Sequence, residues 1–354
     1  MSRFFTEKLS GLEPYTPGEQ PRDMQYIKLN TNESPFPPSE KAVAFAREEA
    51  ARLLLYPDPT CKALTDKLAD YFGVQPDNII VNNGSDETLY FAFMAFCDEE
   101  RPAYFPNISY GFYPVFAQIN RLPYTEIPLR EDFTIDPDDY IGKNGFVVIA
   151  NPNAPTGIAL SLNEIERIVA GNPDGVVVVD EAYVDFGARS AVPLTKKYDN
   201  LLVVQTFSKS RSMAGARLGF GVGNAELIRD LNTIKFSTNP YNINRMTMAA
   251  GVGALEDDDY MKANCAAIME NRAWTVAELQ KRGFTVLDSA ANFIFARHPR
   301  IDGKELYLTL KKNGILVRHF DKPALCQYNR ITIGAKEQME ALIAAIGRLW
   351  EDVL

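Results

Sequence analysis

Residues 147–183 read VVIANPNAPTGIALSLNEIERIVAGNPDGVVVVDEAY, with two apolar runs on either side of a helical pattern. The runs 147–150 and 176–179 are continuously apolar, which is typical of parallel strands buried on both faces. Between them, Ser161 and Glu164 have the spacing of a capping box, and apolar side chains follow at helical spacing. This order of elements predicts a βαβ unit in a parallel sheet.

Two further apolar runs extend the predicted sheet. Residues 78–81 and 201–204 are rich in β-branched and aliphatic side chains, so they are also expected to be buried strands.

The N-terminal 30 residues are rich in Pro, Gly and polar residues, which is typical of an arm rather than a domain.

After about residue 245 the pattern changes. A long helical stretch over 258–282 ends at Gly283, and two strand-like segments, 292–295 and 314–317, come after it. A closing helix carries an apolar stripe, made of Met339, Leu342, Ile343, Ile346, Leu349 and Val353.

The predicted fold class is α/β. We expect a large domain over 31–245, with a mostly parallel central sheet covered by helices, and a smaller α+β domain over 246–354. Residues 1–30 are expected to form an N-terminal arm that is part of the small domain.

Charge and composition exclude several classes of protein. The chain has 354 residues and a net charge of −9 without a basic block, which argues against nucleic acid or an anionic membrane as its main partner. It has no apolar run of the roughly 18 residues that a bilayer requires, and no signal peptide at its start. Four scattered Cys and two His predict neither a disulfide framework nor a metal site. We expect a soluble, cytoplasmic protein.

Polar residues follow three of the predicted strands. Lys209 comes soon after the strand at 201–204, next to the hydroxyls of Thr206 and Ser208 and eight residues before Arg217. Hydroxyls and a cation suit a phosphate, and a lysine with a lowered pKa is a nucleophilic amine. The same residues taken alone also fit an ordinary surface loop with a solvated lysine.

The other two groups are equally ambiguous by themselves. Asp180 and Tyr183 follow the all-valine strand, where a carboxylate needs a cation or a donor, although Asp180 alone also fits a helix N-cap. Ser85 and Asp86 begin a helical run, where free backbone N–H groups bind phosphate, although plain capping explains them too. The chain lacks both the GxxxxGK[ST] loop of nucleoside triphosphatases and the glycine spacing of a dinucleotide-binding site.

The combination is more specific than its parts. An amine, a carboxylate, a tyrosine hydroxyl and a phosphate cradle are the groups that a pyridoxal phosphate enzyme needs. Together with NPNAPTG at 151–157, DEAY at 180–183 and SK at 208–209, they give a chain that resembles the fold-type I, class I and II aminotransferases. The segments 12–15 (LEPY) and 28–35 (KLNTNESP) resemble the subgroup that transfers the amino group of histidinol phosphate to 2-oxoglutarate.

This resemblance implies a role for each cofactor-binding position. Lys209 would be covalently linked to pyridoxal 5′-phosphate and would act as the catalytic residue that moves protons between Cα and C4′. Asp180 would pair with the pyridine nitrogen, Tyr183 would donate to the phenolic oxygen, and Tyr110 would stack on the ring. The cofactor phosphate would be held by Ser85, Asp86, Thr206, Ser208 and Arg217, and by Tyr56 from the partner subunit of a homodimer.

The resemblance also implies the substrate contacts. Arg330 would bind the carboxylate of glutamate, and Arg318 and Tyr15 would contact the distal phosphate of histidinol phosphate. One position departs from the family pattern, because Ala154 stands where most relatives have an Asn that contacts the phenolic oxygen. Asn153 takes over this contact, or Tyr183 makes it alone.

Three alternatives share these residues. An aminotransferase for aromatic amino acids uses the same cofactor groups, and a threonine-phosphate decarboxylase is a lyase with a similar scaffold. A sensor domain without activity is disfavoured, since Lys209 is present and the chain has no DNA-binding module.

Overall fold

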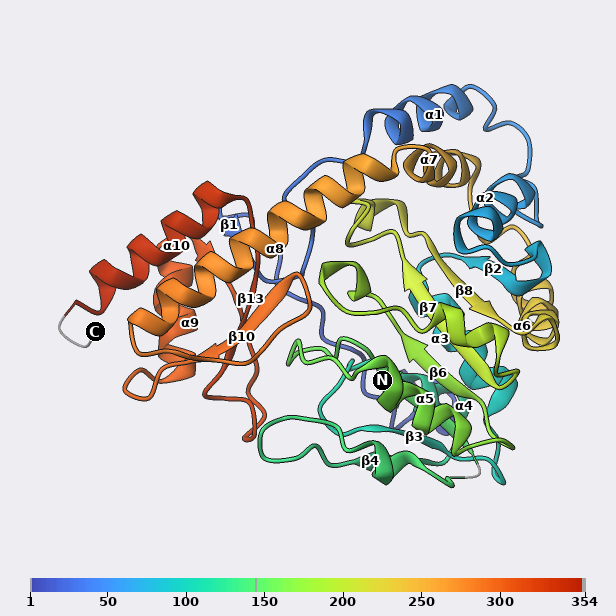
Figure 1. Cartoon of the computed structure of the whole chain (residues 1–354), viewed down its shortest axis with the longest axis horizontal. Coiled ribbons are helices and arrows are strands. Elements are labelled where there is room, and N and C mark those ends of the chain that lie inside the picture. Colours follow the sequence, from blue (N-terminus) through green and yellow to red (C-terminus); the bar gives the residue numbers. More distant parts are fainter. Residues whose placement is uncertain (1, 144, 352–354) are drawn as a thin grey trace.

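The computed structural model describes residues 2–143 and 145–351, and a seven-stranded sheet is its largest element (Figure 1). The strand order is β2-β8-β7-β6-β5-β3-β4, in which β8 is antiparallel to both of its neighbours and the other pairs are parallel. The strands are β2 (Ile79–Asn82), β3 (Ala103–Pro106), β4 (Tyr124–Ile127), β5 (Phe146–Ala150), β6 (Val177–Asp180), β7 (Leu201–Thr206) and β8 (Gly219–Gly223).

The predicted βαβ unit is confirmed by β5, α5 (Leu162–Ala170) and β6. The capping box begins α5 as expected, because Ser161 Oγ accepts from Glu164 N at 3.3 Å and Glu164 Oε2 accepts from Ser161 N at 2.7 Å. Every residue of β5 and β6 is buried.

Two hydrophobic cores explain why these strands are continuously apolar. Val147 and Val177 face a core shared with α2 (Lys62–Phe72) and α5, whereas Val148 and Val178 face the opposite one. Because successive side chains of a strand point to opposite faces, a sheet with a core on each side has no polar alternation. Three helices supply the second core, α3 (Ser85–Phe96), α4 (Tyr113–Asn120) and α6 (Ala225–Thr238).

A second, four-stranded sheet has the order β12-β13-β10-β9. Its strands are β9 (Thr285–Val286), β10 (Phe293–Arg297), β12 (Arg318–His319) and β13 (Asn329–Thr332). The long helix α8 (Asp258–Lys281) runs from this unit toward α1 (Glu40–Ala50) and α7 (Arg245–Leu255), as Figure 1 shows. Helices α9 (Gly303–Lys312) and α10 (Lys336–Leu349) complete the unit. Five residues of the predicted stripe lie on α10, and Val353 lies outside the described residues.

The strand expected over 314–317 is confirmed as β11 (Ile315–Leu316), which is two residues long. The next strand, β12, follows almost at once but belongs to the four-stranded sheet, whereas β11 does not. In the N-terminal arm, β1 (Ile27–Lys28) pairs in parallel with β11, and this pairing joins the arm to the C-terminal part of the chain. The boundaries of the two domains at residues 30 and 245 stay a prediction.

The arrangement places the loops after β5, β6 and β7 at one edge of the large sheet, since these strands are parallel neighbours. In open α/β sheets this carboxyl edge is where ligands bind. No helix in the described part of the chain is long and apolar enough to span a membrane.

Candidate active site

A cavity of about 520 Å³ lies at the carboxyl edge of the large sheet, between this sheet and loops of the second sheet. The N-terminal arm and the residues just after it also contribute to its wall, through Tyr15 and residues 30–33. The predicted site residues that line the cavity are Tyr15, Ser85, Asp86, Tyr110, Asp180, Tyr183, Thr206, Ser208, Lys209, Arg217, Arg318 and Arg330. The structure therefore brings together residues that are far apart in the sequence.

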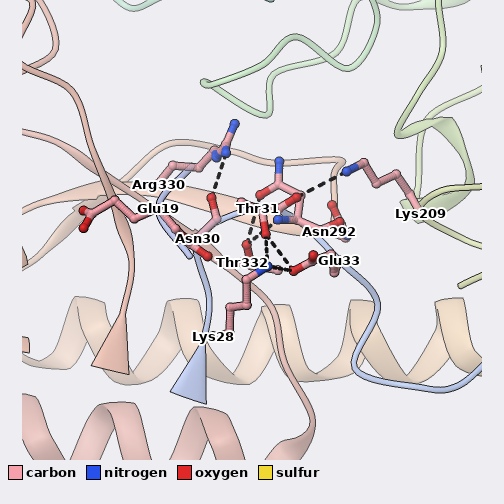
Figure 2. A network of polar contacts seen from close by, with 10 residues as sticks. Glu19, Lys28, Asn30, Thr31, Glu33, Lys209, Asn292, Arg330 and Thr332 are labelled. Atoms are coloured by element: carbon pink, nitrogen blue, oxygen red, sulfur yellow. Dashed lines mark hydrogen bonds and ion pairs between the residues drawn. The ribbon is translucent and has the colours of Figure 1, made fainter. Parts of the chain in front are cut away.

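Lys209 follows β7, and its side chain extends into the cavity. Its Nζ lies 3.3 Å from the carbonyl oxygen of Thr31 (Figure 2). The same Nζ lies 5.7 Å from the centre of the Tyr183 ring. Desolvation in the cavity and the positive charge of Arg330 lower the pKa of Lys209 to about 8. About a tenth of the amine is therefore neutral at pH 7, which is the form that a nucleophile or a general base requires.

Asp180 is the last residue of β6 and is buried beneath the cavity. Its Oδ2 accepts from the Tyr113 hydroxyl at 2.8 Å, and its Oδ1 accepts from the backbone N–H of Ala182 at 3.2 Å. Desolvation raises the pKa of Asp180 to about 6, and no described cationic side chain forms a salt bridge with this carboxylate. A buried carboxylate without a counter-ion is suited to a cationic ligand group.

Hydroxyls and backbone N–H groups converge where α3 begins. Ser85 is the first residue of this helix, and Thr206 Oγ1 donates to Ser208 Oγ at 2.9 Å on the neighbouring loop. Gly219 permits the close approach, because a Cβ there would lie 2.2 Å from the backbone nitrogen of Ser85. The N-terminus of a helix flanked by hydroxyls is an anion site.

Asp86 connects this anion site to an aromatic wall. Its Oδ2 pairs with Arg217 Nη2 at 2.9 Å, and its Oδ1 accepts from the Tyr110 hydroxyl at 2.7 Å. Tyr110 in turn meets the ring of Tyr113 edge to face, with 5.7 Å between the ring centres. The contacts of Asp86 thus fix the orientation of both Arg217 and Tyr110.

The opposite end of the cavity is cationic. Arg330, on β13, donates through Nη2 to the carbonyl oxygen of Asn30 at 3.0 Å, and its buried Nε has no partner among the described residues. Arg318, on β12, donates to the carbonyl oxygens of Thr16 and Pro17, each at 3.2 Å. Two guanidinium groups with donors to spare are suited to a carboxylate or a phosphate.

Tyr15 closes this end from the arm. Its ring stacks on Phe112 with 4.2 Å between the centres and 28° between the planes. Desolvation raises the pKa of the Tyr15 phenol, so the group stays a neutral hydrogen-bond donor at neutral pH.

Two predicted residues do not line the cavity. Asn153 is buried, and its amide donates to the Ile108 carbonyl at 3.0 Å and to Thr156 Oγ1 at 3.2 Å, so it holds its own loop in place. Ala154, beside it, does line the cavity. Tyr56 is 77% exposed and stacks on Tyr241 of the same chain, with 4.6 Å between the ring centres.

Sequence reasoning missed Tyr113 and Asn32. Tyr113 lies in the same aromatic segment as Tyr110, but nothing local indicates that its hydroxyl reaches a carboxylate 67 residues away. Asn32 donates through Nδ2 to the Tyr183 hydroxyl at 3.0 Å, over a separation of 151 residues. The only signal for Asn32 in the sequence was its position in the segment 29–32 (LNTN).

The residues present fit pyridoxal 5′-phosphate. Asp180 offers a buried, uncompensated carboxylate to a protonated ring nitrogen, and Lys209 offers an amine whose pKa is about 8 to an aldehyde. The anion site at the start of α3 suits the phosphate group. These groups face one cavity, so a single ligand can meet them together.

Comparison with known proteins identifies the class. A family model for class I and II aminotransferases matches residues 24–346, so this chain belongs to that family, whose members use pyridoxal phosphate. Among the curated relatives is a histidinol-phosphate aminotransferase of Brachyspira hyodysenteriae, 49% identical over 98% of this chain and 98% of its own length. Another is the histidinol-phosphate aminotransferase of a Marinomonas species, 50% identical over 99% of this chain and all of its own.

A solved structure agrees in fold. The histidinol-phosphate aminotransferase of Sinorhizobium meliloti, in complex with pyridoxal-5′-phosphate, is similar with a TM-score of 0.89 over 100% of this chain and 99% of its own. Its sequence identity is 23%, so it supports the fold alone. The predicted α/β fold with a mostly parallel sheet is confirmed.

Proposed function

We propose that the protein transfers the amino group of L-histidinol phosphate to 2-oxoglutarate, giving imidazole acetol phosphate and glutamate, as a step of histidine biosynthesis. The observation that carries the proposal is the placement of Lys209, Arg318 and Arg330 around one cavity, so that an amine and two guanidinium groups face the same ligand space. Full-length similarity to histidinol-phosphate aminotransferases supports the same substrate.

Pyridoxal phosphate, when bound, supplies an electron sink that makes the Cα proton of an amine substrate removable. Lys209 is the group placed to take that proton, because its pKa of about 8 leaves it partly neutral at pH 7. The carbonyl of Thr31 accepts from Nζ at 3.3 Å and gives the free amine a resting position. The same amine can return the proton to the cofactor side.

Asp180 and the anion site hold the ligand at its two polar ends. The carboxylate of Asp180 is kept in place by Tyr113 and by the N–H of Ala182, so it presents a fixed negative charge. Arg217, oriented by Asp86, adds positive charge next to the start of α3. Fixed charges of this kind need no reorganisation during the reaction.

The cationic end is suited to both substrates. Arg330 can bind a carboxylate of glutamate or the phosphate of histidinol phosphate, since the planar carboxylate and the tetrahedral phosphate each present two anionic oxygens to a guanidinium group. Arg318 and Tyr15 lie at the same end, where the phosphate of the longer substrate extends. One pocket then serves both half-reactions, as an aminotransferase requires.

We also propose that the protein acts as a homodimer in the cytoplasm. Leu53, Leu54, Leu55 and Tyr56 form an exposed apolar segment, and Tyr241 adjoins it, which is typical of a surface that another subunit covers. In a dimer, Tyr56 would reach the phosphate site of the partner. All four cysteines are free, which suits a reducing compartment.

The proposal is tested with a panel of amino compounds. The purified enzyme, loaded with pyridoxal phosphate, is supplied with 2-oxoglutarate and with L-histidinol phosphate, L-phenylalanine or L-threonine phosphate. We expect glutamate to form with the highest kcat/KM from histidinol phosphate. A preference for phenylalanine, or carbon dioxide release from threonine phosphate without glutamate, would show that the substrate has been assigned wrongly.

A further inference from the structure

Residues 30–32, where the N-terminal arm ends, contact three residues of the candidate site in succession. The carbonyl of Asn30 accepts from Arg330, and the carbonyl of Thr31 accepts from Lys209, as Figure 2 shows. The next residue, Asn32, donates through its side-chain amide to the hydroxyl of Tyr183 at 3.0 Å. The first two contacts use backbone atoms, which any residue supplies, whereas the third needs the side chain of Asn32.

Asn32 is held firmly by the second sheet. It is 1% exposed, its backbone N–H donates to Thr332 Oγ1 at 3.0 Å, and its carbonyl accepts from Asn292 Nδ2 at 3.0 Å. Its side-chain Oδ1 accepts from Thr332 Oγ1, also at 3.0 Å. The backbone of Asn32 has a φ of 58°, a left-handed conformation that Asn adopts more readily than most residues.

This network fixes which way the amide of Asn32 faces. The hydroxyl of Thr332 already accepts the backbone N–H of Asn32, so its own proton is free to be donated to Oδ1. The oxygen of the amide therefore faces Thr332, and the NH₂ group faces Tyr183. With the amide reversed, the proton of Thr332 would lose this acceptor.

The consequence falls on the proton of Tyr183. Since the phenolic oxygen accepts from Asn32, the Tyr183 proton points elsewhere, and no described residue accepts it. Away from Asn32, the ring meets Phe293 edge to face at 5.0 Å and packs with Ala154, and neither side chain offers an acceptor. On the side of the cavity, Lys209 Nζ lies 5.7 Å from the centre of the ring. The open direction is the cavity that Tyr183 lines.

We propose that Asn32 is a positioning residue, which makes the Tyr183 hydroxyl a hydrogen-bond donor into the cavity, toward the phenolic oxygen of pyridoxal phosphate. The inference rests on the proposed function, because it presumes that this cofactor occupies the cavity. Burial raises the pKa of the Tyr183 phenol, while the hydrogen bond from Asn32 acts in the opposite direction and makes the hydroxyl a stronger donor.

Two substitutions distinguish the role of the side-chain NH₂ donor of Asn32 from the role of its left-handed backbone. Asn32→Asp keeps the oxygen that accepts from Thr332 but offers Tyr183 an acceptor, so the phenolic proton turns away from the cavity. Asn32→Gly removes the side chain and tolerates the left-handed backbone, which Ala would not. If Asn32→Asp does not fold, as judged by thermal denaturation, Asn32→Gly carries the test.

The measurement is the affinity of the apoprotein for pyridoxal phosphate, together with the absorbance maximum of the bound cofactor. We expect the Kd to rise about tenfold in Asn32→Asp and about threefold to fivefold in Asn32→Gly. The absorbance maximum should shift in both, since it responds to hydrogen bonding at the phenolic oxygen.

The decisive control repeats both substitutions in a Tyr183→Phe background. If Asn32 acts through the Tyr183 hydroxyl, neither substitution changes the Kd or the absorbance maximum further. If the effects persist there, or are absent in the wild-type background, the inference is wrong while the proposed function stands. Failure of the wild-type apoprotein to bind pyridoxal phosphate would overturn both.

Discussion

At the scale of residues, burial and a neighbouring charge together set the pKa of Lys209. Desolvation is the largest cause of its lowered pKa, and the guanidinium of Arg330 adds to it by repulsion. Arg330 itself is partly buried, and burial lowers its pKa too, although a guanidinium stays charged at neutral pH. The cation that we propose to bind substrate therefore also lowers the pKa of the amine.

The pH dependence of cofactor loading follows from this pKa. Because only the neutral amine reacts with an aldehyde, the rate at which apoprotein takes up pyridoxal phosphate should rise about fivefold from pH 7 to pH 8, about twofold from pH 8 to pH 9, and level off above that. Stopped-flow absorbance between pH 7 and 10 measures it. In Arg330→Met the plateau should move to higher pH, and a wild-type rate that still rises at pH 10 would show that the amine is not activated.

The pKa of Asp180 is shifted upward, in the opposite direction to that of Lys209. Burial raises its pKa to about 6, so the carboxylate is charged above pH 6 and neutral below it. The affinity of the apoprotein for pyridoxamine phosphate should therefore increase from pH 5 to pH 7. In Asp180→Asn we expect affinity about a hundredfold weaker at pH 7.5. If the affinity of Asp180→Asn for pyridoxamine phosphate still increased from pH 5 to pH 7, this role of Asp180 would be contradicted.

Which residues sequence reasoning could find depended on whether their signal was local. Lys209, Asp180 and Ser85 stand directly after apolar runs, so their position at the ends of strands was readable. Asn32 and Tyr113 act through contacts with residues 151 and 67 positions away, and no short pattern encodes such pairs. The role of Asn153 was similarly hidden, because its amide donates to the carbonyl of Ile108, 45 residues away, as well as to Thr156 in its own loop.

At the scale of elements, the close contact between β8 and the start of α3 shapes the anion site. A Cβ on Gly219 would lie 2.2 Å from the nitrogen of Ser85 and 2.4 Å from the carbonyl carbon of Gly84, both of them backbone atoms that cannot move aside cheaply. By contrast, a Cβ on Gly215 would meet nothing within 4 Å. Two glycines four positions apart are thus constrained very differently.

Gly219→Ala should therefore lower the free energy of unfolding by about 3 kcal/mol and weaken the binding of pyridoxal phosphate at least tenfold, because overpacking displaces the N-terminus of α3. Gly215→Ala is the matched control and should change stability by less than about 0.5 kcal/mol. Urea unfolding and cofactor titration measure both. Equal behaviour of the two variants would contradict the close approach.

The capping box of α5 offers a prediction that concerns the fold but not the chemistry. Ser161→Ala removes the acceptor for Glu164 N and should destabilise the protein by about 1 kcal/mol. Because Ser161 does not line the cavity, the Kd for pyridoxal phosphate should not change. A changed Kd together with unchanged urea unfolding would contradict this separation.

Elements were predictable from periodicity where one pattern ran without interruption. The strands β5, β6 and β7 and the helix α8 were expected within a few residues of their bounds. The strand expected over 314–317 is present as β11, but the strand that follows it, β12, was not expected. The chain passes from one sheet to another between Leu316 and Arg318, and the hydrophobic pattern does not register this change.

At the scale of the whole molecule, the cavity is formed by parts that are distant in the sequence. The arm supplies Tyr15, and Asn32 lies just after it. The large sheet and the loop after β7 supply Asp180 and Lys209, and the second sheet supplies Arg330. The pairing of β1 with β11 ties the arm to the second sheet. The net charge of −9 gave no hint of the cationic end, since a sum over the chain says nothing about a local site.

The apolar segment 53–56 leads to a prediction about assembly. Leu54 is 85% exposed, so Leu54→Glu should cost the monomer little, yet it would place a charge in a subunit interface. We expect the wild type to sediment as a dimer, and the variant to dissociate at micromolar concentration with weaker binding of pyridoxal phosphate. A wild type that sediments as a fully active monomer would contradict the role given to Tyr56.

The central claim is that Lys209 carries pyridoxal phosphate and exchanges an amino group with L-histidinol phosphate. Borohydride reduction of the loaded enzyme, with mass spectrometry of its peptides, tests this directly, because reduction makes the lysine–cofactor link permanent. We predict cofactor on the Lys209 peptide alone, its loss after prior addition of L-histidinol phosphate, and its return when 2-oxoglutarate is added. Cofactor fixed on another lysine, or labelling of Lys209 that histidinol phosphate does not prevent, would contradict the claim.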